Sequence, residues 1–129
     1  MKPDTKSEKT TEDYLEAMLV IKQKNGYVRS IDVAQHLGVT KPSVTYTTKR
    51  LKEKGYIVMD KDNYISITDS GMEIAEKILN RHNTLSAFFI SIGVNEETAK
   101  EDACKIEHDI SAETFNALCK YIEKNKERG

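Results

Sequence analysis

The sequence has no long hydrophobic run and no apolar leader. Its apolar stretches, such as residues 17–21 and 87–90, are far too short to cross a bilayer, which takes about 20 apolar residues. Residues 1–7 are polar and lack the apolar core of a secretory signal peptide. We therefore expect a cytoplasmic protein with no membrane partner.

Cysteine is scarce as well. The 129 residues contain two, Cys104 and Cys119, and they are not arranged as Cys-x-x-Cys. A disulfide between them is not expected in a cytosolic protein, because thiols are kept reduced there. The economical interpretation assigns one thiol to a metal site and the other to core packing.

Neither sign of charge is in excess. The chain has 20 Lys and Arg against 21 Asp and Glu, for a net charge of −1, so the distribution is more informative than the sum. Residues 41–54 are basic with Glu53 as their only acid, whereas residues 8–16 and 95–113 are rich in acids. One basic element beside acidic ones suits a protein that contacts phosphate with one face and a cation with another.

The first half of the chain has the pattern of a winged helix-turn-helix. A helix is expected over residues 10–24, opened by a capping box at residues 10–13, and a second over residues 31–37, capped by Ser30. A third begins near Lys41, with Pro42 in its first turn, and ends near residue 54. Residues 56–59 and 64–67 flank a polar turn and predict a β-hairpin.

The second half shows only helical patterns. A long helix begins near Ser70 and continues to Gly93, and Asn95 and Ser111 cap two more helices that end near residues 109 and 124. We therefore predict a mainly α protein. A disordered lead (1–9) precedes a winged helix-turn-helix DNA-binding domain (10–70) and an all-helical dimerisation and metal-binding domain (71–129), with the boundary inside the long helix.

The long helix also carries an apolar face made of Leu85, Phe88, Phe89 and Ile92. We expect this face, with the helix at residues 70–83, to form the surface of a homodimer. The alternative is that the four side chains fill an intramolecular core.

The third predicted helix has the composition of a DNA-reading element. In helix-turn-helix proteins the second helix of the motif enters the major groove, and its N-terminal side chains meet base edges. Here that end carries Lys41, Pro42, Ser43, Thr45 and Tyr46. Phosphate contacts are expected from Lys49, Arg50 and Lys52, and from Lys61 at the hairpin tip. The alternative is a solvated basic face on a protein-interaction module.

Three segments carry side chains that bind metals. The six candidates are Asp13 and Glu16 on the first helix, His82 on the long helix, and Cys104, Glu107 and His108 near residue 109. The last three are spaced i, i+3 and i+4, which on a helix places a thiolate, a carboxylate and an imidazole on one face. Each has an ordinary alternative, such as a capping acid for Asp13 or a small buried residue for Cys104. The full set behind a DNA reader indicates a metal-sensing repressor.

The order of these motifs resembles the DtxR/MntR family of bacterial metalloregulators. The resemblance rests on residues 12–16 (Glu-Asp-Tyr-Leu-Glu), the helix at 39–50, Arg81-His82 and Cys104-x-x-Glu107-His108, and it covers about residues 10–124. Its metal motifs are specific, whereas its helix-turn-helix is common to many families. The resemblance implies a homodimer that binds palindromic operator DNA with divalent iron or manganese as corepressor.

The same resemblance, taken position by position, suggests a hybrid of two branches. Asp13, Glu16, His82, Glu107 and His108 match the ligands of the manganese regulators. Cys104 stands where that branch has a carboxylate and matches the iron branch, which in turn has Met at position 13. Ser86 and Lys100 stand where the iron branch has ligands of its ancillary site. The chain is expected to be a short form without the C-terminal SH3-like domain.

The donor set leaves the identity and number of metal ions open. Carboxylates favour Mn(II), whereas a thiolate favours Fe(II), Co(II) or Zn(II). We expect Fe(II) or Mn(II) in the cell, and Zn(II), Co(II) or Ni(II) to bind in vitro, because affinity follows the Irving–Williams order.

These features predict a metal-dependent transcriptional repressor that controls metal-uptake genes. The main alternative is a metal-independent winged-helix regulator that responds to a small ligand or a partner protein. An enzyme with a small-molecule substrate is not expected, because Cys104 and His108 have no third orienting residue and no Gly-rich loop accompanies them.

Overall fold

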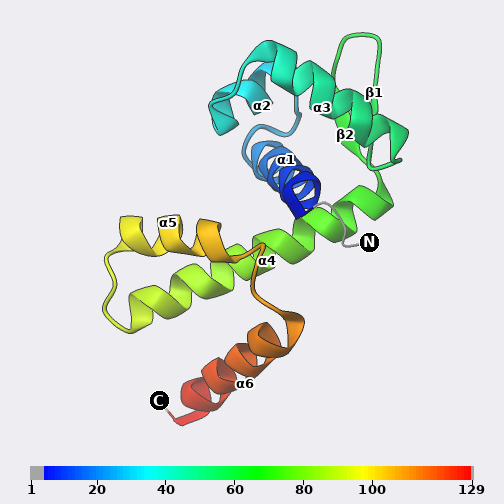
Figure 1. Ribbon diagram of the computed structural model, residues 1–129. Coiled ribbons are helices and arrows are strands. Elements are labelled where there is room, and N and C mark those ends of the chain that lie inside the picture. The colour runs from blue at the N-terminus through cyan, green and yellow to red at the C-terminus, as the bar shows by residue number, and fades with distance from the viewer. Residues whose placement is uncertain (1–4, 129) are drawn as a thin grey trace. The chain divides into compact units, whose positions relative to one another are not determined.

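A computed structural model describes residues 5–128, which form six helices and a two-stranded antiparallel sheet (Figure 1). In chain order the elements are α1 (Thr5–Asn25), α2 (Ser30–Leu37), α3 (Lys41–Glu53), β1 (Ile57–Met59), β2 (Ile65–Ile67), α4 (Asp69–Ser91), α5 (Glu96–Ile106) and α6 (Ala112–Arg128). The predicted mainly helical class is confirmed. No helix within residues 5–128 has the length and apolar character that a membrane span requires.

The chain divides into two compact units between residues 77 and 78, inside α4. We call them the N-terminal unit and the C-terminal unit. In the N-terminal unit α1 packs against α2, α2 against α3, and α3 against β1. The inward face of α1 is buried and consists of Tyr14, Leu15, Met18, Leu19 and Ile21. Val44 and Leu51 of α3 are buried too.

The predicted start of α1 is wrong. The helix begins at Thr5, so residues 5–9, which we assigned to a disordered lead, are helical; residues 1–4 of that lead lie outside the described part of the chain. Residues 10–13 lie within the helix and do not open it. The physical reason is that Glu8 and Lys9 are good helix formers, and Glu8 lies in the first turn, where the helix dipole favours a carboxylate.

The helix-turn-helix and its hairpin are formed by local hydrogen bonds. Thr40 caps α3, because its Oγ1 accepts a hydrogen bond from Ser43 N at 3.3 Å. The N-cap of α2 is Arg29 rather than the predicted Ser30, and the Asp32 carboxylate accepts the Arg29 N–H at 3.1 Å. β1 and β2 pair antiparallel with Ile57 opposite Ile67. This is a winged helix-turn-helix.

The C-terminal unit is built on caps that the sequence predicted. Asn95 Oδ1 accepts hydrogen bonds from the backbone at the start of α5, and Ser111 Oγ accepts one from Thr114 N at 3.1 Å at the start of α6. α5 ends at Ile106, short of the predicted residue 109, and the chain turns over residues 107–110. That turn carries two of the candidate metal ligands.

The core of this unit is the buried cluster of Leu85, Ala103 and Phe115. Phe89, Ile110, Leu118 and Cys119 pack against it while partly buried. Cys119 is a free thiol in this core, so it has the packing role that the sequence suggested for one of the two cysteines.

Candidate metal centre and nucleic-acid interface

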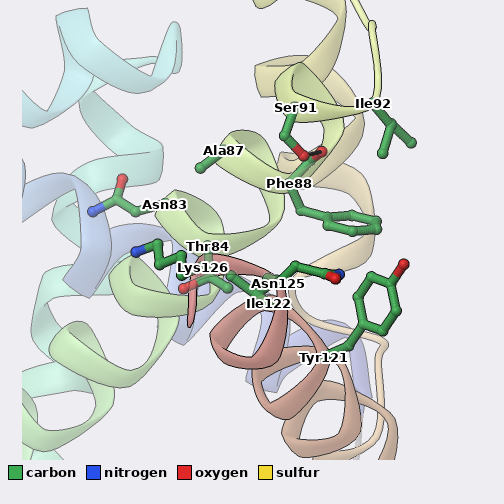
Figure 2. Close-up of a pocket in the computed structure, with 10 residues that line it drawn as sticks. All are labelled: Asn83, Thr84, Ala87, Phe88, Ser91, Ile92, Tyr121, Ile122, Asn125 and Lys126. Carbon is green, nitrogen blue, oxygen red and sulfur yellow. Dashed lines mark hydrogen bonds between the residues drawn. The ribbon is translucent and has the colours of Figure 1, made fainter. Parts of the chain in front are cut away.

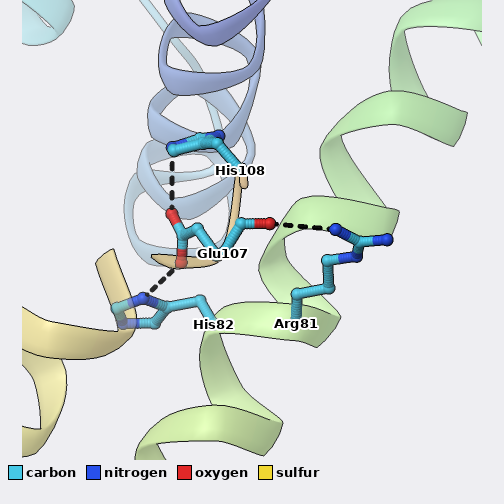
Figure 3. Close-up of polar contacts among 4 residues, drawn as sticks. All are labelled: Arg81, His82, Glu107 and His108. Carbon is cyan, nitrogen blue, oxygen red and sulfur yellow. Dashed lines mark hydrogen bonds and ion pairs between the residues drawn. The ribbon is translucent and has the colours of Figure 1, made fainter. Parts of the chain in front are cut away.

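A buried carboxylate lies between two imidazoles in the C-terminal unit (Figure 3). The side chain of Glu107 is 0% exposed. Its Oε2 lies 2.8 Å from His82 Nδ1, and its Oε1 lies 3.4 Å from His108 Nε2. His82 belongs to α4, whereas Glu107 and His108 belong to the turn that follows α5. We call His82, Glu107 and His108 the imidazole–carboxylate cluster.

The donors of this cluster fit a divalent transition metal. Among the residues that the structure describes, none donates a hydrogen bond to the buried Glu107 Oε1. A buried carboxylate is costly unless a positive charge or hydrogen bonds compensate it, and a metal ion supplies that charge. Imidazole nitrogens with a carboxylate oxygen are a common ligand set for divalent iron, manganese and zinc.

Arg81 supports the backbone that carries these ligands. Its side chain is buried, and its Nη1 donates hydrogen bonds to the main-chain oxygens of Glu107 and Ile110, at 3.1 and 2.8 Å. The guanidinium also lies over the ring of Phe115, 5.3 Å from its centroid. The sequence indicates Arg81 only as part of an Arg-His motif, because nothing close to residue 81 in the chain reveals a contact with residues 107 and 110.

Cys104 differs from Glu107 and His108 in its exposure. It lies on the last turn of α5 and is exposed. α5 ends at Ile106, so His108 is in a turn rather than on the helical face that the i, i+3, i+4 spacing predicted. The role of Cys104 as a ligand stays a prediction.

Asp13 and Glu16 lie three residues apart on α1, in the N-terminal unit, and each is partly buried. This spacing places them on one face of the helix. Their part in a metal site stays a prediction too.

The outer face of α3 presents the predicted DNA-contacting side chains. The exposed set is Lys41, Pro42, Ser43, Thr45, Tyr46, Lys49, Arg50 and Lys52, and Lys61 is exposed in the turn between β1 and β2. Val44, Thr48 and Leu51 face the core instead. The helix therefore has one basic, hydroxyl-bearing face and one apolar face, as a groove-reading helix requires.

Contacts within α3 restrict what some of these groups can do. Thr45 Oγ1 donates its proton to the Lys41 carbonyl at 3.0 Å, which leaves it as an acceptor for a base. Arg50 Nη1 donates to the Tyr46 hydroxyl at 2.9 Å, and its guanidinium lies over the Tyr46 ring. Tyr46 and Arg50 thus act as a pair, which their i, i+4 spacing permits but sequence reasoning treated separately.

A groove of about 560 Å³ runs between α4 and α6 (Figure 2). Its apolar lining is Ala87, Phe88, Ile92, Tyr121 and Ile122. Phe88 and Tyr121 meet edge to face at a centroid distance of 6.5 Å. Ile92 and Tyr121 are 64% and 59% exposed. We call this the α4–α6 groove.

The four residues predicted for the dimer surface divide between two environments. Leu85 is buried and Phe89 packs against its cluster, as the intramolecular alternative expected. Phe88 and Ile92 line the α4–α6 groove.

Comparison with known protein families accounts for nearly the whole chain. Residues 7–64 match the family model described as "Iron dependent repressor, N-terminal DNA binding domain". Residues 68–128 match the model described as "Iron dependent repressor, metal binding and dimerisation domain".

Individual relatives are similar over most of their length. A helix-turn-helix transcriptional regulator of Methanocaldococcus jannaschii, described as uncharacterised, is 37% identical over 119 residues, which are 91% of this chain and 95% of that protein. The transcriptional regulator MntR of Geobacillus thermodenitrificans is 32% identical over 120 residues, or 91% of this chain and 85% of that protein.

Solved structures share the fold. The metal-dependent transcriptional regulator MtsR superposes with a TM-score of 0.80 at 25% identity, over 88% of this chain and 53% of that one. IdeR of T. acidophilum superposes with a TM-score of 0.77 at 25% identity, over 87% and 53%. This chain therefore spans about half the length of these two structures.

Proposed function

Since this chain belongs to the iron-dependent repressor family, as a metal-dependent transcriptional repressor of the DtxR/MntR type, we propose that it senses Fe(II) or Mn(II) and controls metal-uptake genes. The family consists of transcriptional regulators that bind operator DNA and dimerise through their C-terminal domain. The observation that supports a sensor is the buried Glu107 carboxylate between His82 and His108. Since its target is chromosomal DNA, we propose that it acts in the cytoplasm.

The proposed ligand set is larger than the imidazole–carboxylate cluster. Asp13 and Glu16 would add carboxylates from α1, and Cys104 would add a thiolate or line the site. Without a cation these anions repel one another when they are brought together, so they favour separation of α1 from the turn at residues 107–110. A bound divalent ion supplies the positive charge that makes their convergence favourable. Metal would then restrict how the N-terminal unit moves relative to the C-terminal unit.

The choice of ion follows from the donor atoms. Three carboxylates with two imidazoles favour Mn(II), and participation of Cys104 would shift the preference toward Fe(II). Zn(II), Co(II) and Ni(II) are expected to bind in vitro as well. Sites with nitrogen, oxygen and sulfur donors bind these ions more tightly than they bind Mn(II) or Fe(II).

DNA reading is assigned to α3. Tyr46, with Pro42 and Thr45, would contact base edges, and Lys49, Arg50 and Lys52 would contact phosphates. In a two-fold symmetric dimer the two α3 helices enter successive major grooves, so we propose a palindromic operator with half-sites about 10 base pairs apart or a multiple of that spacing.

The partner surface of the dimer is proposed to be the α4–α6 groove. Phe88→Glu is expected to shift the chain from dimer to monomer, because it would bury a charge at an apolar contact. Size-exclusion chromatography with light scattering measures the change. Ile90→Glu is the matched control, because Ile90 is exposed on α4 but is not a lining residue of the groove. A dimeric Phe88→Glu variant would refute this surface.

The proposed sensor is tested by an anaerobic DNA-binding titration on the native promoter. Chelator, Mn(II), Fe(II), Co(II) and Zn(II) are applied in separate arms. Metal is expected to tighten operator binding by about 5- to 150-fold, the usual range for coupled sites, and operator DNA should tighten metal binding by the same factor. His108→Ala should abolish the metal response.

Two cysteine variants complete that titration. Cys104→Ala is expected to alter the ranking of metals, whereas Cys119→Ala, a core position, should leave the ranking unchanged. DNA affinity that ignores chelator and metal in the wild-type chain would leave a winged-helix regulator of another kind and remove the metal sensor.

A further inference from the structure

Arg81 and His82 are consecutive residues of α4 and hold Glu107 at two different points (Figure 3). His82 Nδ1 contacts the Glu107 carboxylate at 2.8 Å, whereas Arg81 Nη1 donates to the Glu107 main-chain oxygen at 3.1 Å. The same Arg81 nitrogen donates to the Ile110 main-chain oxygen at 2.8 Å. One guanidinium therefore bridges both ends of the turn that carries Glu107 and His108.

The two main-chain oxygens that Arg81 contacts lie just beyond the end of α5, where the regular hydrogen bonds of the helix stop. α5 ends at Ile106, and the last carbonyls of a helix have no partner within the helix. A planar guanidinium donates in fixed directions and keeps its charge when buried, so it defines the path of such a turn more tightly than an ammonium group would. Arg81 is only 8% exposed, and the Phe115 ring lies beneath it.

We infer that Arg81 is a positioning residue for metal binding: it fixes the turn at residues 107–110 so that Glu107 and His108 face His82 before the ion arrives. Arg81 itself brings no metal donor, because a guanidinium has no lone pair to offer. The inference rests on the proposed metal-sensing function. It adds that the affinity for metal depends on Arg81, which is not a ligand, through its hydrogen bonds to the backbone of the turn at residues 107–110.

The sign of the expected effect separates positioning from electrostatics. Arg81 is a cation close to the backbone of a proposed metal ligand, so its charge by itself opposes the binding of another cation. Arg81→Gln removes that charge and would strengthen metal binding if charge alone mattered. If Arg81 positions the turn, the same substitution weakens binding, by about 10- to 100-fold as for other groups that orient metal ligands.

The test uses Co(II) as the probe ion with the full chain under anaerobic conditions. Affinity is measured by competition with a chelator, and the visible absorption bands of Co(II) at saturation report its coordination geometry. For Arg81→Gln we expect weaker binding and altered bands. For Arg81→Lys we expect an intermediate loss, because Lys keeps the charge but lacks the planar fork.

Phe115→Leu is the control for loss of stability alone. It removes the ring beneath the guanidinium and lowers the melting temperature, but it leaves the two carbonyl hydrogen bonds of Arg81 available. Its Co(II) bands at saturation should match those of the wild-type chain.

Wild-type affinity and bands in a folded Arg81→Gln variant would overturn the inference and leave the proposed sensor standing. If circular dichroism shows that Arg81→Gln is unfolded, a folded Arg81→Lys variant with wild-type affinity and bands would overturn it instead. A wild-type chain that binds no Co(II) would overturn the sensor, and the inference with it.

Discussion

Replacing Glu107 by Gln is expected to weaken metal binding by about 100-fold or more while leaving the metal-free chain at least as stable as the wild type. Removing one partner of a buried charged pair costs about 3–5 kcal/mol, and each 1.4 kcal/mol is about a factor of ten in affinity. The metal-free chain responds in the opposite direction, because its fully buried carboxylate is expensive without a cation. Gln has nearly the same shape and carries no charge, so it relieves that cost.

Two measurements check this pair of effects. Competition titration with Mn(II) and Co(II) gives the affinities, and thermal unfolding in chelator gives the stability of the metal-free chain. Glu101→Gln is the matched control, because Glu101 is an exposed carboxylate on α5. An unchanged metal affinity in Glu107→Gln would remove the imidazole–carboxylate cluster from the site. A large loss of stability without metal would mean that Glu107 is a structural residue first.

Replacing Gly71 by Ala is expected to destabilise the N-terminal unit by about 3 kcal/mol, the upper part of the usual range for overpacking, and with it to lose DNA binding. A Cβ at Gly71 would collide with the Tyr56 carbonyl oxygen and would stand 2.9 Å from Ile67 Cγ2. The Tyr56 carbonyl accepts a hydrogen bond from Thr68 N at 3.0 Å. The added methyl group would therefore force apart the junction where the hairpin meets α4.

Denaturant unfolding of the full chain measures this loss, and Gly26→Ala is the informative control. Gly26 has φ +84°, and a methyl group there would meet no neighbouring atom within 4 Å, so Ala should cost only the backbone strain of about 1–2 kcal/mol. Glu73→Ala, an exposed change on the same helix as Gly71, should be close to neutral. Equal stability of Gly71→Ala and Glu73→Ala would contradict the close approach of α4 to Tyr56.

Elements that depend on neighbouring residues were predictable. The caps at Asn95 and Ser111 are each made with an amide two or three residues away, so the starts of α5 and α6 could be predicted from the sequence, and Pro42 indicated the start of α3. The inward face of α1 and the order of elements in the winged helix follow from periodicity in the same way. The start of α1 was not predictable in this way, because the capping-box pattern at residues 10–13 lies inside a longer helix that begins at Thr5.

The candidate site was predictable in its chemistry and only partly in its geometry. The sequence identified His82, Glu107 and His108 by residue type and by a family resemblance, and the structure brings these three together. The sequence did not indicate that Cys104 is exposed, because the spacing of Cys104 and His108 presumes a helix through residue 108, whereas α5 ends at Ile106. Phe88 and Phe89 are adjacent in the chain, and only packing sends one to the groove and the other to the core.

By itself the sequence determined the helical class, the reading helix, the metal-binding residue types and the family. These depend on residue chemistry and on contacts across one or two helical turns. The tertiary structure decided that Glu107 is buried against His82, 25 positions away, and that Arg81 reaches the oxygens of Glu107 and Ile110. Burial and contacts between distant residues arise only when helices pack. A carboxylate is costly, and a turn carbonyl needs a protein donor, only once packing has excluded water from them.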